Sequence, residues 1–501
     1  MSQNTITLNA GIVKRNSLSC SGSPKTYIHC AVALVIGLVI AFGIRPDNGL
    51  TELGVSVLAV TVPTLYLWLT VNTGWCALLF LAMLIMTGAM TPTAVWAGSM
   101  GHFAVITMIV FSILNYALKE TGVIDKIAAW FITRRIADGR PYVFLGLFFL
   151  SNIVIGMFVD NLSLAVIYVG IAAALAERIG VKKGDPFYAC MFIGILWCNV
   201  VISIASPIAH APVLILIGMM ETQLGISVSY AKWLMFGIPF AVIMFAVMIA
   251  AAYIWHPDAS AFKNFDFEGF RRQERENPLD IRGRIAAGVF VIAVLAILLP
   301  ELTRGIFPAF SAYMSGIGVV VPAILAVCAL CLIQTDGRPI LDFGKAAQTL
   351  PLPAIIFAGV VCVMSTPFSS PETGISTWLG SIIQPLFGSM PPFVIMLLLT
   401  IAALVMTNFL SNVVTMVIFF NIGIALLSEG SVDIGAYAAV IGFASSMASL
   451  TPSACAPAPL IFGPGHVTVR GVLKANLVFI ILSCIAILAV VYPLASYIIG
   501  A

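Results

Sequence analysis

The sequence predicts an all-α polytopic membrane protein. Of its 501 residues, 61% are hydrophobic and only 9% are charged, and the mean hydropathy is +1.08. A water-soluble domain could not cover its surface with so few polar groups. Apolar runs of about 20 residues, the length that a helix needs to cross a bilayer, recur along the chain.

About eleven of these runs are expected to be transmembrane helices. The first follows a polar stretch that ends at Lys25, and it is expected to stay in the protein because a chain with so many spans needs no cleaved signal peptide. The expected spans are residues 28–44, 53–71, 74–89, 101–118, 187–220, 233–255, 284–300, 312–333, 352–366, 436–463 and 472–498.

Two further apolar segments, 141–178 and 391–428, are too long for one crossing and are expected to be re-entrant hairpins. With these hairpins and a cytoplasmic N-terminus, all but three of the 24 Lys and Arg residues lie on the cytoplasmic side. The exceptions are Arg45, Lys232 and Arg304. A single crossing at either segment would reverse every later loop and remove this bias. The C-terminus is then external.

The hairpins are expected to enter from opposite sides and to define an inverted repeat. Their central stretches, GMFVDNLSLAVIY and TNFLSNVVTMVIF, share a Phe, an Asn and a following apolar helix. The predicted organisation is a cytoplasmic tail (1–27), a first repeat with the cytoplasmic-side hairpin (28–255), a cytoplasmic linker (256–283) and a second repeat with the external-side hairpin (284–501).

Each hairpin is followed by the same proline motif, SPIAHAP at 206–212 and TPSACAP at 451–457. Two prolines separated by small residues interrupt a helix, and irregular backbone at membrane depth is tolerated only inside protein or along a watery cavity. The fifth and tenth spans are therefore expected to be broken helices whose ends can bind ions. Inverted repeats with broken helices are typical of secondary transporters. The sequence has no Walker motif, Cys/His cluster or nucleic-acid-binding pattern.

Polar residues at the hairpin tips are the first candidates for a binding site. Asp160 and Asn161 stand in an apolar context, either as a helix cap or as groups that face a cavity. Ser411, Asn412 and Thr415 repeat the pattern in the second hairpin, which favours a site.

Polar residues at the breaks are the second candidates. His210 is either a substrate or proton contact or a local hydrogen-bonding group, and its repeat partner is Cys455, which argues against a paired metal site. Other polar residues near the breaks either link helices or supply oxygen ligands to a cation. They are Asn199, Ser203, Ser445, Ser446 and Ser449.

These motifs resemble those of the divalent anion/sodium symporter family, within the ion transporter superfamily. The resemblance covers most of the chain and includes LKETGVIDKIAAWF at 118–131 and LIFGPGHVTVRGVLKANL at 460–477. It places the family's tip motifs at 160–162 and 411–413, and its broken-helix motifs at 210–213 and 455–458.

The resemblance implies sodium-coupled symport of a small anion, with Na⁺ as the coupling ion and no enzymatic activity. It also implies a homodimer in which a transport domain moves against a scaffold, as in an elevator. The residues expected to bind the anion are Asp160, Asn161, Ser163, His210, Pro212, Ser411, Asn412, Thr415, Thr451 and Pro457. Those expected to bind Na⁺ are Asn161, Ser206, Asn412 and Thr451.

Departures from the family pattern leave one alternative function open. Apolar residues replace the Thr of both tips, and Asp160 stands where the family has Ser. An Asp repels a dianion unless it is protonated or paired with a cation. The alternative is a sodium/proton antiporter in which Asp160 exchanges the two ions. An intramembrane enzyme with Asp160 and His210 as acid and base is disfavoured, since the second repeat lacks both.

Overall fold

The computed structural model describes residues 24–499 except 73, 209, 277, 319, 376, 380, 383–389, 428–430 and 453. Most of the predicted tail 1–27 lies outside the described residues, as do Ala209 and Ser453 of the proline motifs. The elements before the linker are α1 (Pro24–Gly43), α2 (Glu52–Thr70), α3 (Gly74–Met86), α4 (Pro92–Gly98), α5 (Phe103–Glu120), α6 (Val123–Ile132), the 3₁₀ helix η1 (Arg135–Ala137), α7 (Pro141–Gly156), α8 (Asn161–Ile179), α9 (Pro186–Ala205), α10 (Ala211–Leu224) and α11 (Tyr230–Trp255).

The linker and the second half continue the helical pattern. Their elements are the 3₁₀ helix η2 (Ser260–Asn264), α12 (Phe267–Glu276), α13 (Ile281–Leu302), α14 (Pro308–Ile317), α15 (Val320–Leu332), strands β1 (Gln334–Thr335) and β2 (Arg338–Pro339), α16 (Phe343–Gln348), α17 (Leu352–Ser369), α19 (Pro392–Met406), α20 (Asn412–Leu427), α21 (Ile434–Ser446), α22 (Ala458–Phe462), α23 (Val469–Ala486), the π-helical η3 (Ile487–Val491) and α24 (Tyr492–Ile499).

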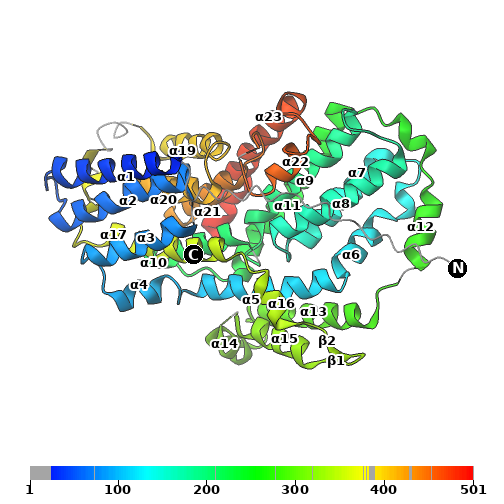
Figure 1. Cartoon of the computed structure of the whole chain (residues 1–501), viewed down its shortest axis with the longest axis horizontal. Coiled ribbons are helices and arrows are strands. Elements are labelled where there is room, and N and C mark those ends of the chain that lie inside the picture. The colour runs from blue at the N-terminus through cyan, green and yellow to red at the C-terminus, as the bar shows by residue number, and fades with distance from the viewer. Residues whose placement is uncertain are drawn as a thin grey trace.

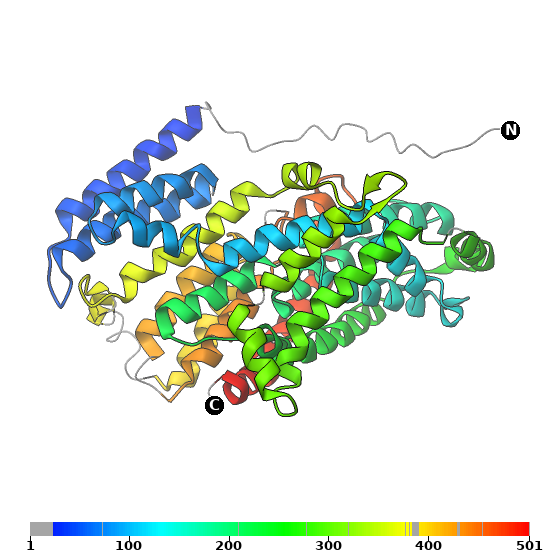
Figure 2. The ribbon, with the colours of Figure 1, turned by 90° about the horizontal axis from the view of Figure 1, so that it is seen from below.

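The predicted all-α polytopic membrane class is confirmed. Among the described residues, eight helices are long and apolar enough to cross a membrane, and eight shorter apolar helices accompany them. The two short strands pair as one antiparallel hairpin. Helix α1 lies at one end of the molecule, drawn in blue in Figure 2, and Ala33 is its one buried residue. Such an exposed apolar helix is what a lipid environment permits.

One part of the prediction needs correction. The expected single span 312–333 is wrong, because α14 ends at Ile317 and α15 begins at Val320. Gly318 has φ +81°, the left-handed conformation that commonly ends a helix. The linker 256–283 contains structure of its own, since η2 and α12 form within it and Phe262 and Phe267 are buried.

The first hairpin, α7 and α8, has both open ends against the linker. At the start of α7, the Tyr142 hydroxyl donates to the carbonyl of Pro257 at 3.3 Å. At the end of α8, the Arg178 guanidinium donates to Gln273 Oε1 at 2.8 Å. The chain therefore enters and leaves this hairpin on one side, as predicted.

The second hairpin, α19 and α20, opens at the other end of the helix bundle. At its start, the Phe393 ring lies 6.4 Å from the Tyr492 ring, and the Ser496 hydroxyl donates to Asp433 Oδ2 at 3.1 Å just beyond its end. Both partners belong to α24, the last part of a 31-residue helical run that starts at Val469. The beginning of this run lies near the first hairpin's side, where Lys183 donates to the Pro464 carbonyl at 2.9 Å. The hairpins thus open at opposite ends, which agrees with an inverted repeat.

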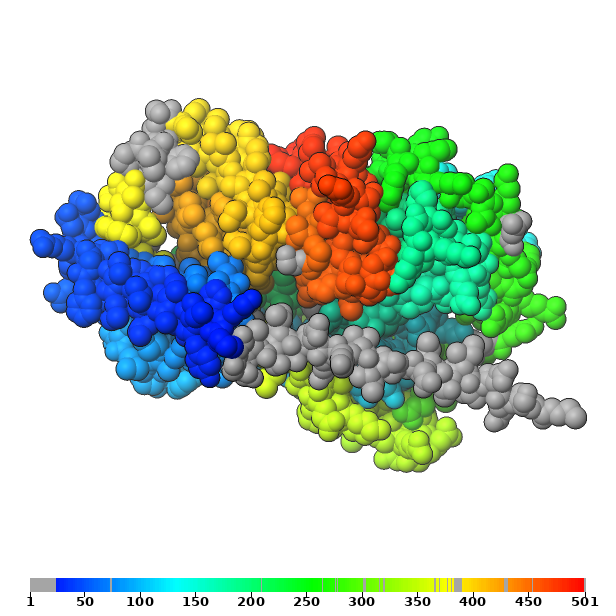
Figure 3. Space-filling view, turned by 45° about the horizontal axis from the view of Figure 1, so that its top comes forward, coloured from blue at the N-terminus to red at the C-terminus, as the bar shows by residue number. Residues whose placement is uncertain are grey.

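Two interrupted helices cross at the centre. The first consists of α9 and α10, separated by 206–210, and the second consists of α21 and α22, separated by 447–457. Helix α9 is almost wholly buried and lies beside α7, α8 and α11 (Figure 1). A Cβ at Gly442 of α21 would meet the Leu216 side chain of α10 at 2.2 Å, so Gly permits this close approach. Figure 3 shows the orange-red region around α22 packed against the teal helices of the first half.

Candidate functional site

The first break holds the tip of the first hairpin. Helix α9 ends before Ser206, whose hydroxyl donates to the main-chain carbonyl of Met157 at 2.5 Å. His210 Nε2 lies 2.6 Å from the carbonyl oxygen of Gly156. Because a carbonyl only accepts, Nε2 carries the hydrogen. Both Ser206 and His210 are buried, so these bonds form inside the protein.

The second break holds the second tip by the same kind of bond. The Thr451 hydroxyl donates to the main-chain carbonyl of Asn408 at 2.5 Å. In the aligned tip sequences, Asn408 stands at the position of Met157, and Thr451 opens its motif as Ser206 does. The last carbonyls of a helix lack partners within that helix. In each repeat, the hydroxyl of the residue that precedes the first proline of the motif donates to such a carbonyl at the end of the first hairpin helix.

Side chains at the second tip also stabilise the irregular backbone of the second break. Asn408 Oδ1 accepts from the main-chain N–H groups of Ser449 at 3.0 Å and Leu450 at 2.8 Å. The Thr407 hydroxyl contacts Asn412 Oδ1 at 3.0 Å and the carbonyl of Ser445. Sequence reasoning missed Thr407 and Asn408, although both lie in the TNFLSNVVT stretch that revealed the tip.

The first tip is bonded to the first break by a different side chain. Gly156 and Met157 occupy the positions of Thr407 and Asn408 and have no polar side chain. The His210 ring from the break supplies the additional hydrogen bond to this tip. The two tips are thus alike in the hydroxyl-to-carbonyl bond and different in which segment contributes the remaining polar side chain.

At the first tip, the predicted residues lie at the start of α8 and α10. Asp160 is the N-cap of α8, and its Oδ1 accepts from the main-chain N–H of Ser163 at 3.0 Å, which confirms the capping role. Asn161 follows as the first residue of α8, and Pro212 is in the first turn of α10. Asp160, Asn161 and Ser163 are half-buried.

At the second tip, the predicted residues begin α20 and α22. Ser411 precedes α20, and its carbonyl accepts from the main-chain N–H of Thr415 at 2.9 Å. Asn412 is the first residue of α20. Pro457 is buried directly before α22.

Several buried oxygen atoms around the tips and breaks have no hydrogen-bond partner among the described residues. Burying such an atom unpaired costs about 1–3 kcal/mol, so a set of them points to a ligand. Hard cations bind side-chain and main-chain oxygens of this kind, and the donor set therefore suits Na⁺. The atoms are Asn152 Oδ1, Asn161 Oδ1, Asn199 Oδ1, Thr415 Oγ1, Ser445 Oγ and Ser449 Oγ. Sequence reasoning missed Asn152, a lone amide in the apolar α7.

The hydroxyls of the two remaining serine candidates donate hydrogen bonds to carbonyls of their own helices. Ser203 donates to the carbonyl of Val200 at 2.8 Å, and Ser446 donates to that of Gly442 at 2.9 Å. These bonds leave Ser203 and Ser446 as local helix features and not as links between helices.

A polar bridge connects the second break to the central helix α9. Asn476 of α23 donates to the carbonyl of Ser449 at 2.8 Å and accepts from Trp197 Nε1 of α9 at 2.6 Å. At the end of α9, Trp233 Nε1 donates to the carbonyl of Ile204 at 2.7 Å. Helix ends have unpaired carbonyls that need such partners when buried. These indole and amide groups fix the ends of both breaks in place.

Contacts between the repeats interlock the two sites. The half-helix α10, which follows the first break, contacts α20 behind the second tip. The half-helix α22, which follows the second break, contacts α8 behind the first tip. Each tip is therefore held by the break of its own repeat and is packed against a half-helix of the other.

Paired hairpins, crossed broken helices and buried unpaired oxygens in an apolar helix bundle define the class of membrane-embedded transporters. The family model described as "Sodium:sulfate symporter transmembrane region" matches residues 25–497. The chain belongs to this family, which confirms the predicted membership of the divalent anion/sodium symporters.

Curated relatives agree with this family. The chain is 24% identical over 473 residues to the sodium-dependent dicarboxylate transporter SdcS of Staphylococcus saprophyticus, covering 91% of this chain and 89% of that protein. It is 22% identical over 463 residues to the protein of the same name in Staphylococcus aureus strain USA300, covering 89% of this chain and 87% of that protein. The similarity thus extends over nearly the whole of both proteins.

Proposed function

We propose that the protein is a sodium-coupled symporter of a small anion, such as a di- or tricarboxylate. The observation that carries this proposal is the set of buried, unpaired oxygen atoms at the tips and breaks, in a chain of the sodium:sulfate symporter family. The names of the relatives support both sodium coupling and a dicarboxylate substrate.

Sodium ions would be held by oxygens where each tip meets its own break. Asn161 and Ser206 would serve the first tip, and Asn412 and Thr451 would serve the second. Asn161 Oδ1 is one of the unpaired atoms, whereas Asn412 Oδ1 already accepts from the Thr407 hydroxyl at 3.0 Å. The hydroxyls of Ser206 and Thr451 donate their hydrogens to tip carbonyls, and the Ser206 oxygen also accepts from the main-chain N–H of Ile208 at 3.2 Å. Bound Na⁺ would supply positive charge beside the anion site.

The anion would lie between the two tips, at the N-termini of α8 and α20. Main-chain N–H groups and the helix dipole favour negative charge there. Asp160, Ser163, His210 and Pro212 would border it from the first repeat. Ser411, Thr415 and Pro457 would border it from the second repeat. Sodium binding before the anion would offset the negative charge of Asp160, which couples the two ligands.

Transport would proceed by an elevator motion in a homodimer. By family resemblance, the hairpins move with the broken helices, α11 and the α23–α24 run, against a scaffold of the other helices. We assign the protein to the plasma membrane, the inner membrane of a bacterium, with a cytoplasmic N-terminus and an external C-terminus. The positive-inside bias supports this orientation.

Uptake into proteoliposomes tests the proposal. Purified full-length protein would be given labelled succinate, citrate or sulfate under an inward Na⁺ gradient, with choline replacing Na⁺ in the control. At least one anion should accumulate only with Na⁺. If the protein instead exchanges Na⁺ for H⁺ and no anion is required, it is a sodium/proton antiporter and the symport proposal is wrong.

The variant Asp160→Asn separates these two functions. Asn is as good an N-cap as Asp, so the variant keeps the bond to Ser163 while it removes the charge. An antiporter that exchanges ions at Asp160 should lose all exchange. A symporter should keep sodium-dependent anion uptake, with altered sodium affinity.

A further inference from the structure

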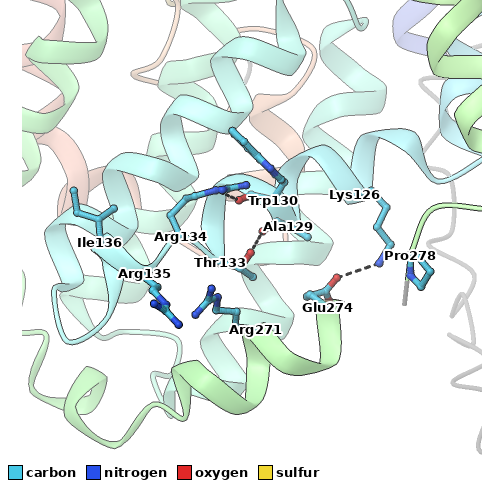
Figure 4. Close-up of a pocket in the computed structure, with 10 residues that line it drawn as sticks. All are labelled: Lys126, Ala129, Trp130, Thr133, Arg134, Arg135, Ile136, Arg271, Glu274 and Pro278. Atoms are coloured by element: carbon cyan, nitrogen blue, oxygen red, sulfur yellow. Dashed lines mark hydrogen bonds and ion pairs between the residues drawn. The ribbon is translucent and has the colours of Figure 1, made fainter. Parts of the chain in front are cut away.

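A basic groove lies away from the tips, between α6, η1 and the linker helix α12 (Figure 4). Its volume is about 710 Å³. The charged and aromatic residues that line it, which define the basic groove here, are Lys126, Trp130, Arg134, Arg135, Arg271 and Glu274. Four of these six carry positive charge and one carries negative charge.

The positive charge of this groove is only partly neutralised. Lys126 pairs with Glu274 at 3.3 Å, and Arg271 pairs with the exposed Glu268 at 3.3 Å. Within the described part of the chain, no carboxylate lies within ion-pair distance of Arg134 or Arg135. In Figure 4 the guanidinium groups of Arg135 and Arg271 point toward one another across the groove. Two facing guanidinium groups suit the oxygens of a phosphate, which accepts several of their hydrogen bonds at once.

Exposed apolar side chains border the same groove. Trp130 is 57% exposed and Ile136 is 58% exposed. The Arg134 guanidinium lies 3.4 Å from the centre of the Trp130 ring, which holds the cation beside the indole. Trp is enriched at the membrane–water interface, and Lys and Arg are enriched in the cytoplasmic segments beside it. The groove therefore has a basic part for a headgroup and an apolar border for acyl chains.

We propose that the basic groove binds the phosphate group of an anionic phospholipid. Basic pockets beside membrane helices bind anionic headgroups in this way. Inorganic phosphate has the same binding chemistry but cannot use Trp130 or Ile136. The proposal depends on the membrane fold and not on the transported anion.

The position of the groove gives the lipid a structural role. Helix α6 and η1 lead directly into the first hairpin, and α12 belongs to the linker between the two halves. Lys126–Glu274 is a direct ion pair between α6 and α12. A phosphate bound by Arg135 and Arg271 adds a second connection between these segments, so anionic lipid should stabilise the protein.

Lipid binding to the full-length protein tests this inference. Binding and melting temperature would be measured in detergent with added phosphatidylglycerol, phosphatidylcholine or millimolar inorganic phosphate. Phosphatidylglycerol should bind and raise the melting temperature, while the other two additives should do so weakly. The variants Arg135→Gln and Arg271→Gln should each weaken phosphatidylglycerol binding about tenfold, since each removes charge-assisted hydrogen bonds.

The control is the double variant Lys182→Gln/Arg338→Gln. It removes two exposed basic residues from the same predicted side, outside the groove. It should bind phosphatidylglycerol as the unaltered protein does. Equal losses in the control and the groove variants, or equal binding of both lipids, would overturn the proposal. Stabilisation by inorganic phosphate as large as that by phosphatidylglycerol would reassign the groove to a free anion.

Discussion

The hydroxyl of Ser206 donates to the main-chain carbonyl of Met157 at 2.5 Å, across 49 residues of sequence. Thr451 and Asn408 repeat this bond in the second half at 2.5 Å. Each broken helix is therefore tied to the tip of its own hairpin. A tip and its break form one unit, and a displacement of one relative to the other requires loss of a half-buried hydrogen bond.

Removal of either hydroxyl should destabilise this unit. Ser206→Ala and Thr451→Val each leave a tip carbonyl without its hydroxyl donor, at a cost of about 1–3 kcal/mol. The melting temperature should fall, and sodium-dependent uptake should fall with it. Ser203→Ala is the matched control, because its hydroxyl bonds only within α9 among the described contacts. A larger effect of Ser203→Ala than of Ser206→Ala would contradict the role of the tip bond.

Asn408 should be more important than its repeat partner Met157. Asn408→Ala removes the acceptor for two main-chain N–H groups of the second break and should cost about 2–4 kcal/mol. Thermal unfolding measures the loss. Asn421→Ala provides the comparison, since that amide donates to Val417 in its own helix. If both variants melt at the same temperature, Asn408 does not support the break.

The proposed sodium ligands predict a specific kinetic change. Asn161→Ala and Asn412→Ala should each raise the Na⁺ concentration for half-maximal uptake about tenfold, the effect of losing one ligand worth about 1.4 kcal/mol. Uptake at saturating Na⁺ should change less. Asn115→Ala is the control, because Asn115 is a buried, unpaired amide on α5, outside the hairpins. If Asn115→Ala raises the Na⁺ concentration for half-maximal uptake by the same factor, Asn161 and Asn412 are not specific sodium ligands.

His466 should make stability depend on pH. It lies in the loop between α22 and α23, its Nδ1 is 2.6 Å from the Tyr188 hydroxyl, and its ring stacks on Phe192. Burial, and then the charge of Lys183, lower the pKa of His466 below its ordinary value near 6.5. As the pH falls, the imidazole of His466 is therefore protonated in the unfolded chain before it is protonated in the folded protein. The free energy of unfolding decreases below about pH 6.5 as a result.

Melting temperatures at pH 7.5 and pH 5 measure this effect. His466→Asn should reduce the difference between the two values. His29→Asn is the matched control, because His29 also contacts a tyrosine hydroxyl, that of Tyr66, at 2.8 Å. A pH dependence that persists unchanged in His466→Asn would assign the effect to another group.

The membrane fold was predictable because it depends on hydropathy and on the placement of basic residues, both of which are properties of single segments. The proline motifs likewise identified the breaks, since proline acts on its own helix. Asp160 was recognisable as a cap because capping is local. The limits of the two repeats and the ligand roles stay predictions.

The features that sequence reasoning missed depend on contacts between distant residues. Asn408 is important because it accepts hydrogen bonds from the main chain of Ser449 and Leu450. Asn476 is important because it forms hydrogen bonds with both Ser449 and Trp197. The basic groove needs α6 and η1 to meet α12, although Arg135 in η1 and Arg271 in α12 are far apart in the sequence. The interruption at Gly318 was missed because hydropathy is continuous across it.

The burial of α9 has a consequence for how the protein is made. The ribosome synthesises α9 before α21 and α23, which later cover part of its surface. Until those helices arrive, lipid or the insertion machinery must cover that surface, and α9 suits this because Asn199 and Ser203 are its only small polar side chains. Insertion precedes helix association in such proteins. A helix that is almost wholly buried in the finished protein thus starts as a segment that faces lipid or the insertion machinery, and assembly of the second half encloses it.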